Sequence, residues 1–369
     1  MTRVALSLAG CDFGRSGVSV VAQQLLPRLG VALESRGASV FAIGTRREQE
    51  SIDWQGQMIA VPSAMDAAAA SAVFALAGLS LLARSFGADA LYLPAANRRI
   101  VGWPRIATVG TVHDLAQFHV ANKYGRLRQL YVEHLLTPTL RRLTRITTVS
   151  QATADDVVRF AGVSPDRIVV VPNGVTLEGT PPAVSPHDRP YFLYPARLEH
   201  PGKNHIRLIQ AFAQSGLAKT HDLVLCGADW GALAQIQDTA HRMGVEKQVV
   251  YAGFVSRETL TGFLAHADAV VVAGLFEGFG LQAVEALALG RPVVASNTGA
   301  LPEVIGELGV LFNPTNVQEI GKALGRSVND EILRARCRRD GPKRASKFSW
   351  DHAAETIADL LIEVSNATP

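Results

Sequence analysis

Short apolar runs alternate along the chain with stretches whose apolar residues recur at helical spacing. The first run, "RVALSLAG", leads to a helical pattern that carries Val18, Val21, Leu25, Leu29 and Leu33, and "ASVFAIG" follows. The alternation continues through "ALYLP", "IATVGTVHD", "RITTVS" and "RIVVVPNG". Apolar runs separated by helical patterns predict parallel strands joined by helices, which is the pattern of a doubly wound α/β sheet.

The segment "TLEGTPPAVSPHDRP", residues 176–190, interrupts this alternation because it holds four prolines and has no periodicity. The pattern restarts with "YFLYPARL", "HDLVLCG", "VVYAGFV" and "ADAVVVAG", and an amphipathic helix pattern ends the chain. We therefore predict an N-terminal Rossmann-like domain at 1–175, a linker at 176–190, a C-terminal Rossmann-like domain at 191–348 and a final helix at 349–369. A cleft is expected between the carboxyl edges of the two sheets.

The composition supports two domains of a globular protein, because 369 residues with 48% hydrophobic and 19% charged residues are enough for two cores. Cys11, Cys226 and Cys337 have no C-x-x-C spacing, which excludes a disulfide framework or a zinc site of that type. We predict reduced thiols and a cytoplasmic protein. The start "MTRVALSLAG" is predicted to be the first strand and not a signal peptide.

Charge is distributed unevenly between the two halves. Residues 1–175 carry 18 Lys and Arg against 12 Asp and Glu, whereas residues 176–369 carry 18 against 21. The positive charge is densest at Lys123, Arg126, Arg128, Arg141, Arg142 and Arg145, which interleave with Leu and Tyr. Two interpretations stay open for this basic row: a face on anionic lipid headgroups, or a solvated helix face. No basic and aromatic stripe of a nucleic-acid-binding module is present.

A second segment is apolar enough to be compared with a membrane-spanning helix. Residues 67–83 form a run of 17 uncharged residues rich in alanine. That length is at the lower limit for a helix that spans a bilayer. We predict a buried or interfacial helix here.

One acidic residue interrupts an otherwise apolar helix pattern. In "FEGFGLQAVEALALGRPVVASNTG", residues 276–299, a glycine-rich turn follows a strand and precedes a short helix. Leu281 and Leu289 lie one turn to either side of Glu285, so the carboxylate is predicted to project from the apolar side of the helix. A buried carboxylate needs partners, and a neighbouring arginine or a helix N-terminus is one interpretation.

Other polar groups follow predicted strands. The loop from Gly10 to Gly17 precedes a helix, where backbone N–H groups can bind phosphate, but its spacing differs from the dinucleotide fingerprint G-x-G-x-x-G. Arg197 and Lys203 in "PARLEHPGKN" could hold a diphosphate or be merely solvated. His113, followed by Asp114, ends a buried-type strand, as functional residues of such sheets do. The sequence has no D-x-D or H-E-x-x-H motif, so no catalytic metal is predicted.

Together these motifs resemble the retaining glycosyltransferases of family 4. The E-x7-E signature of that family matches Glu277 and Glu285, and "VHD", "TVSQATADDVV", "VVVPNGV", "PARLEHPGKN" and "NTGALPEVIG" occur in the family's order. The resemblance implies a GT-B fold of two Rossmann-like domains that face a central cleft. It also implies an acceptor-binding N-terminal domain, a C-terminal domain that binds the nucleotide sugar, and a last helix that crosses back to the first domain.

The resemblance assigns roles to the two acids and to the turn between them. Glu285 would accept hydrogen bonds from the ribose diol of the donor, so its partner would be the ligand. Glu277 would hold hydroxyls of the transferred sugar. Backbone N–H groups at the donor site would come from Gly278, Phe279, Gly280 and Leu281.

It also implies how the donor's diphosphate is held and where the sugar reacts. Arg197 and Lys203 would neutralise the leaving diphosphate, and Gly17 would contact it from the first domain. His113 would lie beside the reacting sugar, with Asp114 in support. Two features depart from the family pattern: the spacing between Arg197 and Lys203 is one residue longer than in many relatives, and "FGRSG" lacks a double glycine.

The implied activity is retaining, metal-independent transfer of a hexose, with mannose from GDP-mannose as the best match and a UDP-sugar as the alternative. The implied acceptor is a glycan or a polyprenyl-diphosphate-linked glycan in polysaccharide biosynthesis, and no cofactor beyond the nucleotide-sugar donor is required. An NAD(P)-dependent oxidoreductase and a non-catalytic sugar-binding protein are weaker alternatives. The predicted location is the cytoplasm, with peripheral association at the inner face of the membrane left open, and no nucleic-acid partner is expected.

Overall fold

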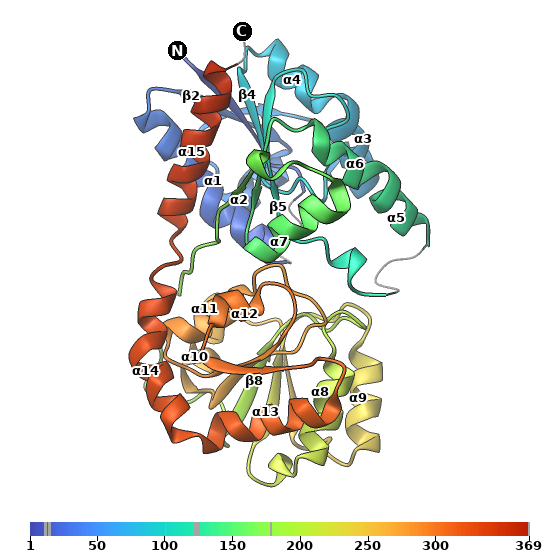
Figure 1. Cartoon of the computed structure of the whole chain (residues 1–369), viewed down its shortest axis with the longest axis vertical. Helices are drawn as coiled ribbons and strands as arrows, with labels where there is room; N and C mark the ends of the chain where they lie inside the picture. Colours follow the sequence, from blue (N-terminus) through green and yellow to red (C-terminus); the bar gives the residue numbers. More distant parts are fainter. Residues whose placement is uncertain (11–12, 14–15, 100, 122–125, 178, 368–369) are drawn as a thin grey trace. The chain divides into compact units, whose positions relative to one another are not determined.

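Figure 1 shows the fold as a computed structural model. The structure describes residues 1–10, 13, 16–99, 101–121, 126–177 and 179–367. The chain divides into two compact units. The first unit comprises Met1–Leu115, Tyr124–Gly174 and Ser349–Pro369, and the second comprises Ala116–Lys123 and Val175–Phe348.

The first unit is built on a seven-stranded parallel sheet of order β3-β2-β1-β4-β5-β6-β7. Its strands are β1 Arg3–Ser7, β2 Ser39–Gly44, β3 Gln57–Ala60, β4 Ala90–Leu93, β5 Ala107–Val112, β6 Arg145–Thr148 and β7 Ile168–Val170. The chain order reverses between β1 and β4, so loops that leave these neighbouring strands diverge at one edge of the sheet.

Helices connect these strands. The α-helices are α1 Gly17–Ser35, α2 Arg46–Ile52, α3 Ala68–Ala77, α4 Leu79–Ser85, α5 Arg126–Tyr131, α6 Thr137–Thr139, α7 Gln151–Asp156 and, from the end of the chain, α15 Trp350–Asn366. The short 3-10 helices are η1 Ser63–Asp66, η4 Leu140–Arg142 and η6 Pro165–Arg167, and the π-helical turns are η3 Val132–Leu136 and η5 Val157–Ala161. Helix α15 packs along α1, where Arg36 pairs with Asp359 at 2.6 Å.

The second unit has a six-stranded parallel sheet of order β10-β9-β8-β11-β12-β13. Its strands are β8 Tyr191–Pro195, β9 Asp222–Cys226, β10 Val249–Gly253, β11 Ala269–Val272, β12 Val293–Ser296 and β13 Gly309–Phe312. Its helices are α8 His205–Gln214, α9 Leu233–Arg242, α10 Arg257–His266, α11 Leu281–Ala288, α12 Leu301–Ile305, α13 Val317–Asn329 and α14 Glu331–Ala345, with η2 Ala116–Phe118 and η7 Leu217–Lys219.

The strand sequences explain why both sheets are covered on both faces. Val270, Val271 and Val272 of β11 are all completely buried, although neighbouring side chains of a strand point to opposite faces. Continuous apolar strands are typical of parallel sheets that are covered by helices on both sides. The prediction of two Rossmann-like parallel α/β sheets is confirmed.

Several local predictions can be compared with the structure. No helix or strand occurs among the described residues between β7 and β8, where the prolines lie. Cys226 and Cys337 are free and buried, and Cys11 lies outside the described residues.

No single described helix is long and apolar enough to cross a membrane, although α3 and α4 pass that test as a pair with a bend of 56° between them.

Candidate active site

The predicted polar residues of the second unit lie at the point where the order of its strands reverses, between β8 and β11. Strands β8 and β11 are neighbours, but the chain runs outward from them to opposite edges. The loop after β8 carries Arg197 and Lys203, and the loop after β11 carries Glu277. Loops at such a switch point diverge and leave room for a ligand at the carboxyl ends of the strands.

An ion pair joins these two loops. Lys203 Nζ donates to Glu277 Oε1 at 2.6 Å, and both side chains are mostly buried. The backbone of Lys203 is held by Tyr194, whose hydroxyl donates to the Lys203 carbonyl at 2.8 Å. Burial raises the pKa of Tyr194 well above its usual value, so this hydroxyl stays protonated as a donor. The sequence placed both residues at the sheet edge but did not pair them.

Arg197 is held by a partner that the sequence analysis did not single out. Its Nε donates to the carboxylate of Glu199, and its guanidinium lies 4.6 Å from the ring centroid of Trp230. Among the described residues, the two Nη nitrogens of Arg197 make no hydrogen bond. They are the part of the guanidinium that can bind a phosphate group, since the planar fork suits bidentate oxygen ligands.

Glu285 is buried as predicted, with 5% of its surface exposed. Its charge is compensated by a neighbouring arginine, one of the two interpretations of the sequence, because Arg257 Nη2 donates to Glu285 Oε1 at 2.6 Å. Arg257 is the first residue of α10 and also donates to the Thr176 carbonyl at 3.1 Å. Among the described residues no hydrogen bond reaches Glu285 Oε2, so one carboxylate oxygen remains for a ligand. No local signal in the sequence links residue 257 to residue 285.

Arg257 is therefore expected to act as a positioning residue for Glu285. An Arg257→Ala variant should bind a nucleoside diphosphate about tenfold more weakly, because removing such a supporting partner lets the ligand-binding group reorient. Isothermal calorimetry with GDP and UDP measures the change, and Arg257→Lys should restore part of the affinity. Tighter binding in Arg257→Ala would show instead that Arg257 competes with the ligand for Glu285.

The glycine-rich turn positions Glu277 through close backbone contacts. Gly280 has φ +87°, in the left-handed region that favours glycine, and it immediately precedes α11. A Cβ on Gly299, whose φ is +59°, would lie 2.2 Å from the Glu277 carbonyl oxygen, and the next residue, Ala300, donates its N–H to that oxygen at 2.9 Å. A side chain at Gly299 would therefore push Glu277 out of place.

The remaining residues of the predicted N–H cradle have distinct places. Gly278 lies in the turn, and Leu281 begins α11. Phe279 is buried and packs edge-to-face against Phe348 with the ring centroids 5.4 Å apart. The structure thus brings this whole predicted segment to the edge of the sheet between β11 and α11.

An aromatic pair beside Glu277 was missed by the sequence analysis. His119 stacks on Phe276 with ring centroids 4.1 Å apart and an interplanar angle of 9°. His119 belongs to the segment Ala116–Lys123, which counts with the second unit although it follows β5 of the first. Its sequence distance from Phe276 left no local pattern that could have revealed the contact.

His113 lies at the carboxyl end of β5 in the first unit, as predicted. It is buried, and its Nε2 lies 2.7 Å from the Pro94 carbonyl oxygen. Because that oxygen can only accept, Nε2 carries the proton and Nδ1 of the neutral ring is an acceptor. Burial lowers the pKa of His113 to about 4, so the imidazole is neutral at neutral pH. Asp114 follows, and its carbonyl accepts from Asn97 Nδ2 at 3.0 Å.

The low pKa of His113 predicts a loss of stability in acid. An unfolded histidine titrates near 6.5 and His113 in the fold at about 4, so between these pH values the unfolded state binds the extra proton. The free energy of unfolding should fall as the pH drops through this window, by on the order of 3 kcal/mol in total. Thermal unfolding at about pH 7 and about pH 4.5 should show a smaller loss for His113→Gln than for wild type. Equal losses would contradict a buried neutral His113.

The phosphate loop predicted in the first unit is only partly described. Gly10 has φ +101°, and Gly17 is the first residue of α1, while residues 11, 12, 14 and 15 lie outside the described part of the chain. Arg98, which the sequence analysis did not single out, donates to the Ser16 hydroxyl at 3.4 Å. It links the loop after β4 to the loop after β1 at the switch point of this sheet.

The predicted basic row is partly tied to protein groups. Arg141 donates to the Ala161 carbonyl, Arg142 donates to the Gly102 carbonyl, and Arg145 pairs with Glu363 at 3.1 Å. Lys123 and the side chains of Arg126 and Arg128 lie outside what the structure describes.

Among the described residues, no group of three or more His, Cys, Asp or Glu side chains is placed to hold a metal ion.

Comparison with known proteins decides the family. The model for glycosyltransferase family 4 matches residues 16–178, and the model for glycosyl transferases group 1 matches residues 180–344. The O-antigen chain mannosyltransferase B of Escherichia coli is 30% identical over 259 residues, which cover 66% of this chain and 67% of that protein. The chain belongs to glycosyltransferase family 4. Membership sets aside the oxidoreductase interpretation.

Three further proteins are similar to this family 4 glycosyltransferase in sequence or in structure. The MMP α-(1→4)-mannosyltransferase of Mycolicibacterium hassiacum is 33% identical over 223 residues, which cover 59% of this chain and about half, 54%, of that protein. Sucrose-phosphate synthase from Thermosynechococcus elongatus has a similar structure, with a TM-score of 0.76, 19% identity and full coverage of both chains. Anabaena Alr3699/HepE in complex with UDP and glucose has a TM-score of 0.75 at 19% identity over 98% of this chain and all of that one. The glycosyltransferase therefore has the GT-B fold.

Proposed function

We propose that this glycosyltransferase transfers mannose from GDP-mannose, with retention of configuration and without a metal ion, to a glycan or a lipid-linked glycan. The observation that supports this most is the pair of acids Glu277 and Glu285, each held by a cation from a different segment, at the switch point of the second sheet. Mannose is proposed because the two curated relatives described above are both named mannosyltransferases.

The donor would lie along the edge formed by the loops after β8 and β11. Glu285 Oε2 would accept from the ribose diol while Arg257 holds the other oxygen. The Nη nitrogens of Arg197 and the ammonium of Lys203 would bind the diphosphate, and Gly17 would approach it with its backbone N–H. With two cations at the diphosphate, the charge that develops on the leaving group is stabilised without a metal.

Glu277 and His113 would orient the sugar. Glu277 accepts from Lys203 through Oε1 and could accept a sugar hydroxyl through Oε2. The neutral ring of His113 would accept a hydrogen bond from a sugar hydroxyl at Nδ1, since Nε2 donates to the Pro94 carbonyl. Neither group is required as a nucleophile. The acceptor oxygen would form its bond to C1 on the face from which the diphosphate departs, and the acceptor proton would pass to a diphosphate oxygen.

The same proposal assigns acceptor binding and nucleotide-sugar binding to different domains. Residues 1–175 would bind the acceptor, residues 191–348 the nucleotide sugar, and 176–190 would link them, while the helix of 349–369 contributes to the first unit through α1. The reaction would take place in the cytoplasm, with polysaccharide assembly at the inner face of the membrane as the proposed setting.

A UDP-sugar donor is the second candidate. It is favoured by the structural similarity to Anabaena Alr3699/HepE, which was solved with UDP and glucose. The same residues would serve this donor, because the ribose and diphosphate are common to both nucleotides.

The proposed reaction is tested by incubating the full chain with GDP-mannose or UDP-glucose in excess EDTA and measuring nucleotide release by chromatography. With water as a slow acceptor, we expect GDP from GDP-mannose, and proton NMR should show α-mannose before mutarotation. Release of UDP alone would reassign the donor. Initial β-mannose would contradict retention, and release that requires added Mg²⁺ would contradict the metal-free mechanism.

A further inference from the structure

Helix α3 presents an apolar face to its surroundings in the first unit. Its sequence, "AAASAVFALA", has Ser71 as its one polar residue, and Ser71 is buried, where its hydroxyl accepts from Arg99 Nε at 2.9 Å. A helix on a protein surface normally directs its polar side chains outward and its apolar stripe inward. Here the polar side chain points inward, so the outward face needs another explanation.

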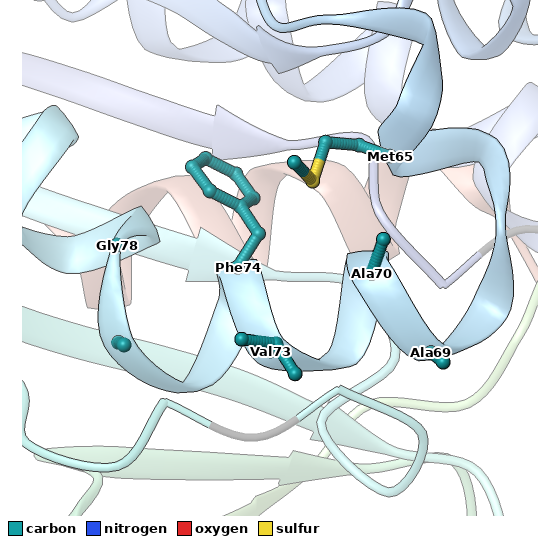
Figure 2. A pocket seen from close by; sticks show the side chains of 7 residues that line it. Met65, Ala69, Ala70, Val73, Phe74 and Gly78 are labelled. Atoms are coloured by element: carbon teal, nitrogen blue, oxygen red, sulfur yellow. The ribbon is translucent and has the colours of Figure 1, made fainter.

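Large apolar residues on α3 and α4 are exposed. Val73 is 65% exposed, Leu76 is 41% exposed, and Leu81 on α4 is 53% exposed. An open pocket lies along η1 and α3, and Figure 2 shows the side chains around it. It is lined by Met65, Ala69, Ala70, Val73, Phe74, Ala77 and Gly78. No polar side chain contributes to that lining, so the pocket offers contacts to hydrocarbon only.

A tryptophan and an arginine border this face. The Gly102 N–H donates to the Leu76 carbonyl at 3.0 Å, which places the next residue, Trp103, beside the C-terminal end of α3. Trp103 is 67% exposed, and the Arg142 guanidinium lies 5.0 Å from its ring centroid. Arginine and tryptophan next to an apolar surface are typical of the boundary between hydrocarbon and water in a bilayer, because each has an apolar body and a polar end.

The charge of the surrounding sequence favours an anionic partner. Residues 67–145 carry ten Lys and Arg against three Asp and Glu, although the whole chain has a net charge of only +3. One of these arginines, Arg142, borders the apolar face through its contact with Trp103, so a partner with acidic headgroups and an apolar interior matches both the face and its border. A second copy of the chain is the alternative occupant of this face, and the experiment below distinguishes it from a lipid surface.

We propose that α3 and α4, together with Trp103, form an interfacial membrane-binding element, with the apolar face of α3 turned toward the acyl chains of an anionic lipid surface. Helix α3 has 10 residues and is bent by 56° from α4, which suits a helix pair that lies in the plane of the interface. The residues that enter the lipid are Val73, Leu76 and Trp103. This inference stands independently of the transfer reaction.

Vesicle flotation of the full chain tests the element. Wild-type protein is expected to float with vesicles of equimolar phosphatidylglycerol and phosphatidylcholine, and less with phosphatidylcholine alone. The double variant Val73→Glu/Leu76→Glu should bind at least about tenfold more weakly, because two apolar side chains lose their burial and two charges are added. The matched control is Val31→Glu, since Val31 is 68% exposed on α1 of the same unit, and it should bind like wild type.

A second readout guards against misfolding of the double variant. Trp103→Phe should keep binding but lose the blue shift of tryptophan fluorescence that vesicles induce in wild type. Failure of wild type to float with anionic vesicles would overturn the proposal, as would unchanged binding of Val73→Glu/Leu76→Glu. Wild-type dimers in sedimentation velocity that the same double variant dissociates would also overturn it, because a second copy of the chain would then cover this face.

Discussion

Glu285→Ala is expected to weaken binding of the nucleoside diphosphate by about 10- to 100-fold. A carboxylate oxygen that accepts from a ribose hydroxyl contributes about 1.5–3 kcal/mol, and 1.4 kcal/mol corresponds to a factor of ten in affinity. Arg257 is 32% exposed at its side chain and can reach water when Glu285 is removed, so the variant should stay folded. Isothermal calorimetry with GDP and UDP measures the effect.

A matched control separates this effect from a general loss of an ion pair. Glu307 pairs with Arg336 at 3.2 Å in the same unit, but its side chain is 88% exposed. Glu307→Ala should leave nucleotide affinity unchanged, because an exposed pair contributes little. Equal nucleotide affinities of Glu285→Ala and wild type would show that Glu285 does not bind the nucleotide.

Lys203→Ala is expected to lower kcat/KM for the nucleotide sugar by about 10²- to 10³-fold, the size seen when one group that stabilises developing charge is removed. The same variant leaves Glu277 without its cation, so the acid that would hold the sugar is also perturbed. Initial rates of nucleotide release measure the effect. Lys247→Ala, a substitution at an exposed lysine of the same unit, serves as the control and should retain full activity.

The pairing of Lys203 with Glu277 adds a further test. If the two residues act as a unit, the double variant Lys203→Ala/Glu277→Ala should be no slower than the slower single variant. Losses that multiply in the double variant would show that each residue acts alone and that their contact at 2.6 Å has no role in turnover.

The fold was predictable because its signals are local. Runs such as "AVVV" of β11 are too short for a helix and too apolar for a half-exposed strand, so they predict strands of a covered parallel sheet. The doubly wound, parallel arrangement also follows from a general rule for alternating β and α elements, whereas the order of the strands comes from the structure. The residues that the sequence placed at the carboxyl edge of the second sheet lie there, because the end of a strand fixes where its loop begins.

The partners within the site were not predictable in the same way. Arg257 begins α10, whereas Glu285 lies in α11, and their contact depends on how two helices pack on the sheet. Similarly, the stacking of His119 on Phe276 joins distant parts of the chain. A single sequence gives periodicity and spacing along the chain, but side-chain contacts between distant segments depend on packing.

The interpretation of Glu285 shows what this difference means for function. The apolar positions around it predicted burial correctly, and the need for a compensating group was also correct. Of the two interpretations of that group, the structure shows a neighbouring arginine, Arg257, on one oxygen, and the ligand implied by the resemblance stays a proposal for the other. The nucleotide role now rests on the second oxygen, which makes Arg257 a part of the proposed site.

The most direct test of the proposed donor is a thermal-shift screen of the full chain against GDP, UDP, ADP, dTDP, NAD and NADP in excess EDTA. A ligand that binds the folded state raises the unfolding temperature according to its concentration relative to Kd. We expect GDP to give the largest rise and NAD and NADP none, with the GDP shift reduced in Glu285→Ala. Stabilisation by NAD or NADP, or by no nucleoside diphosphate at all, would contradict a donor site at Glu277 and Glu285.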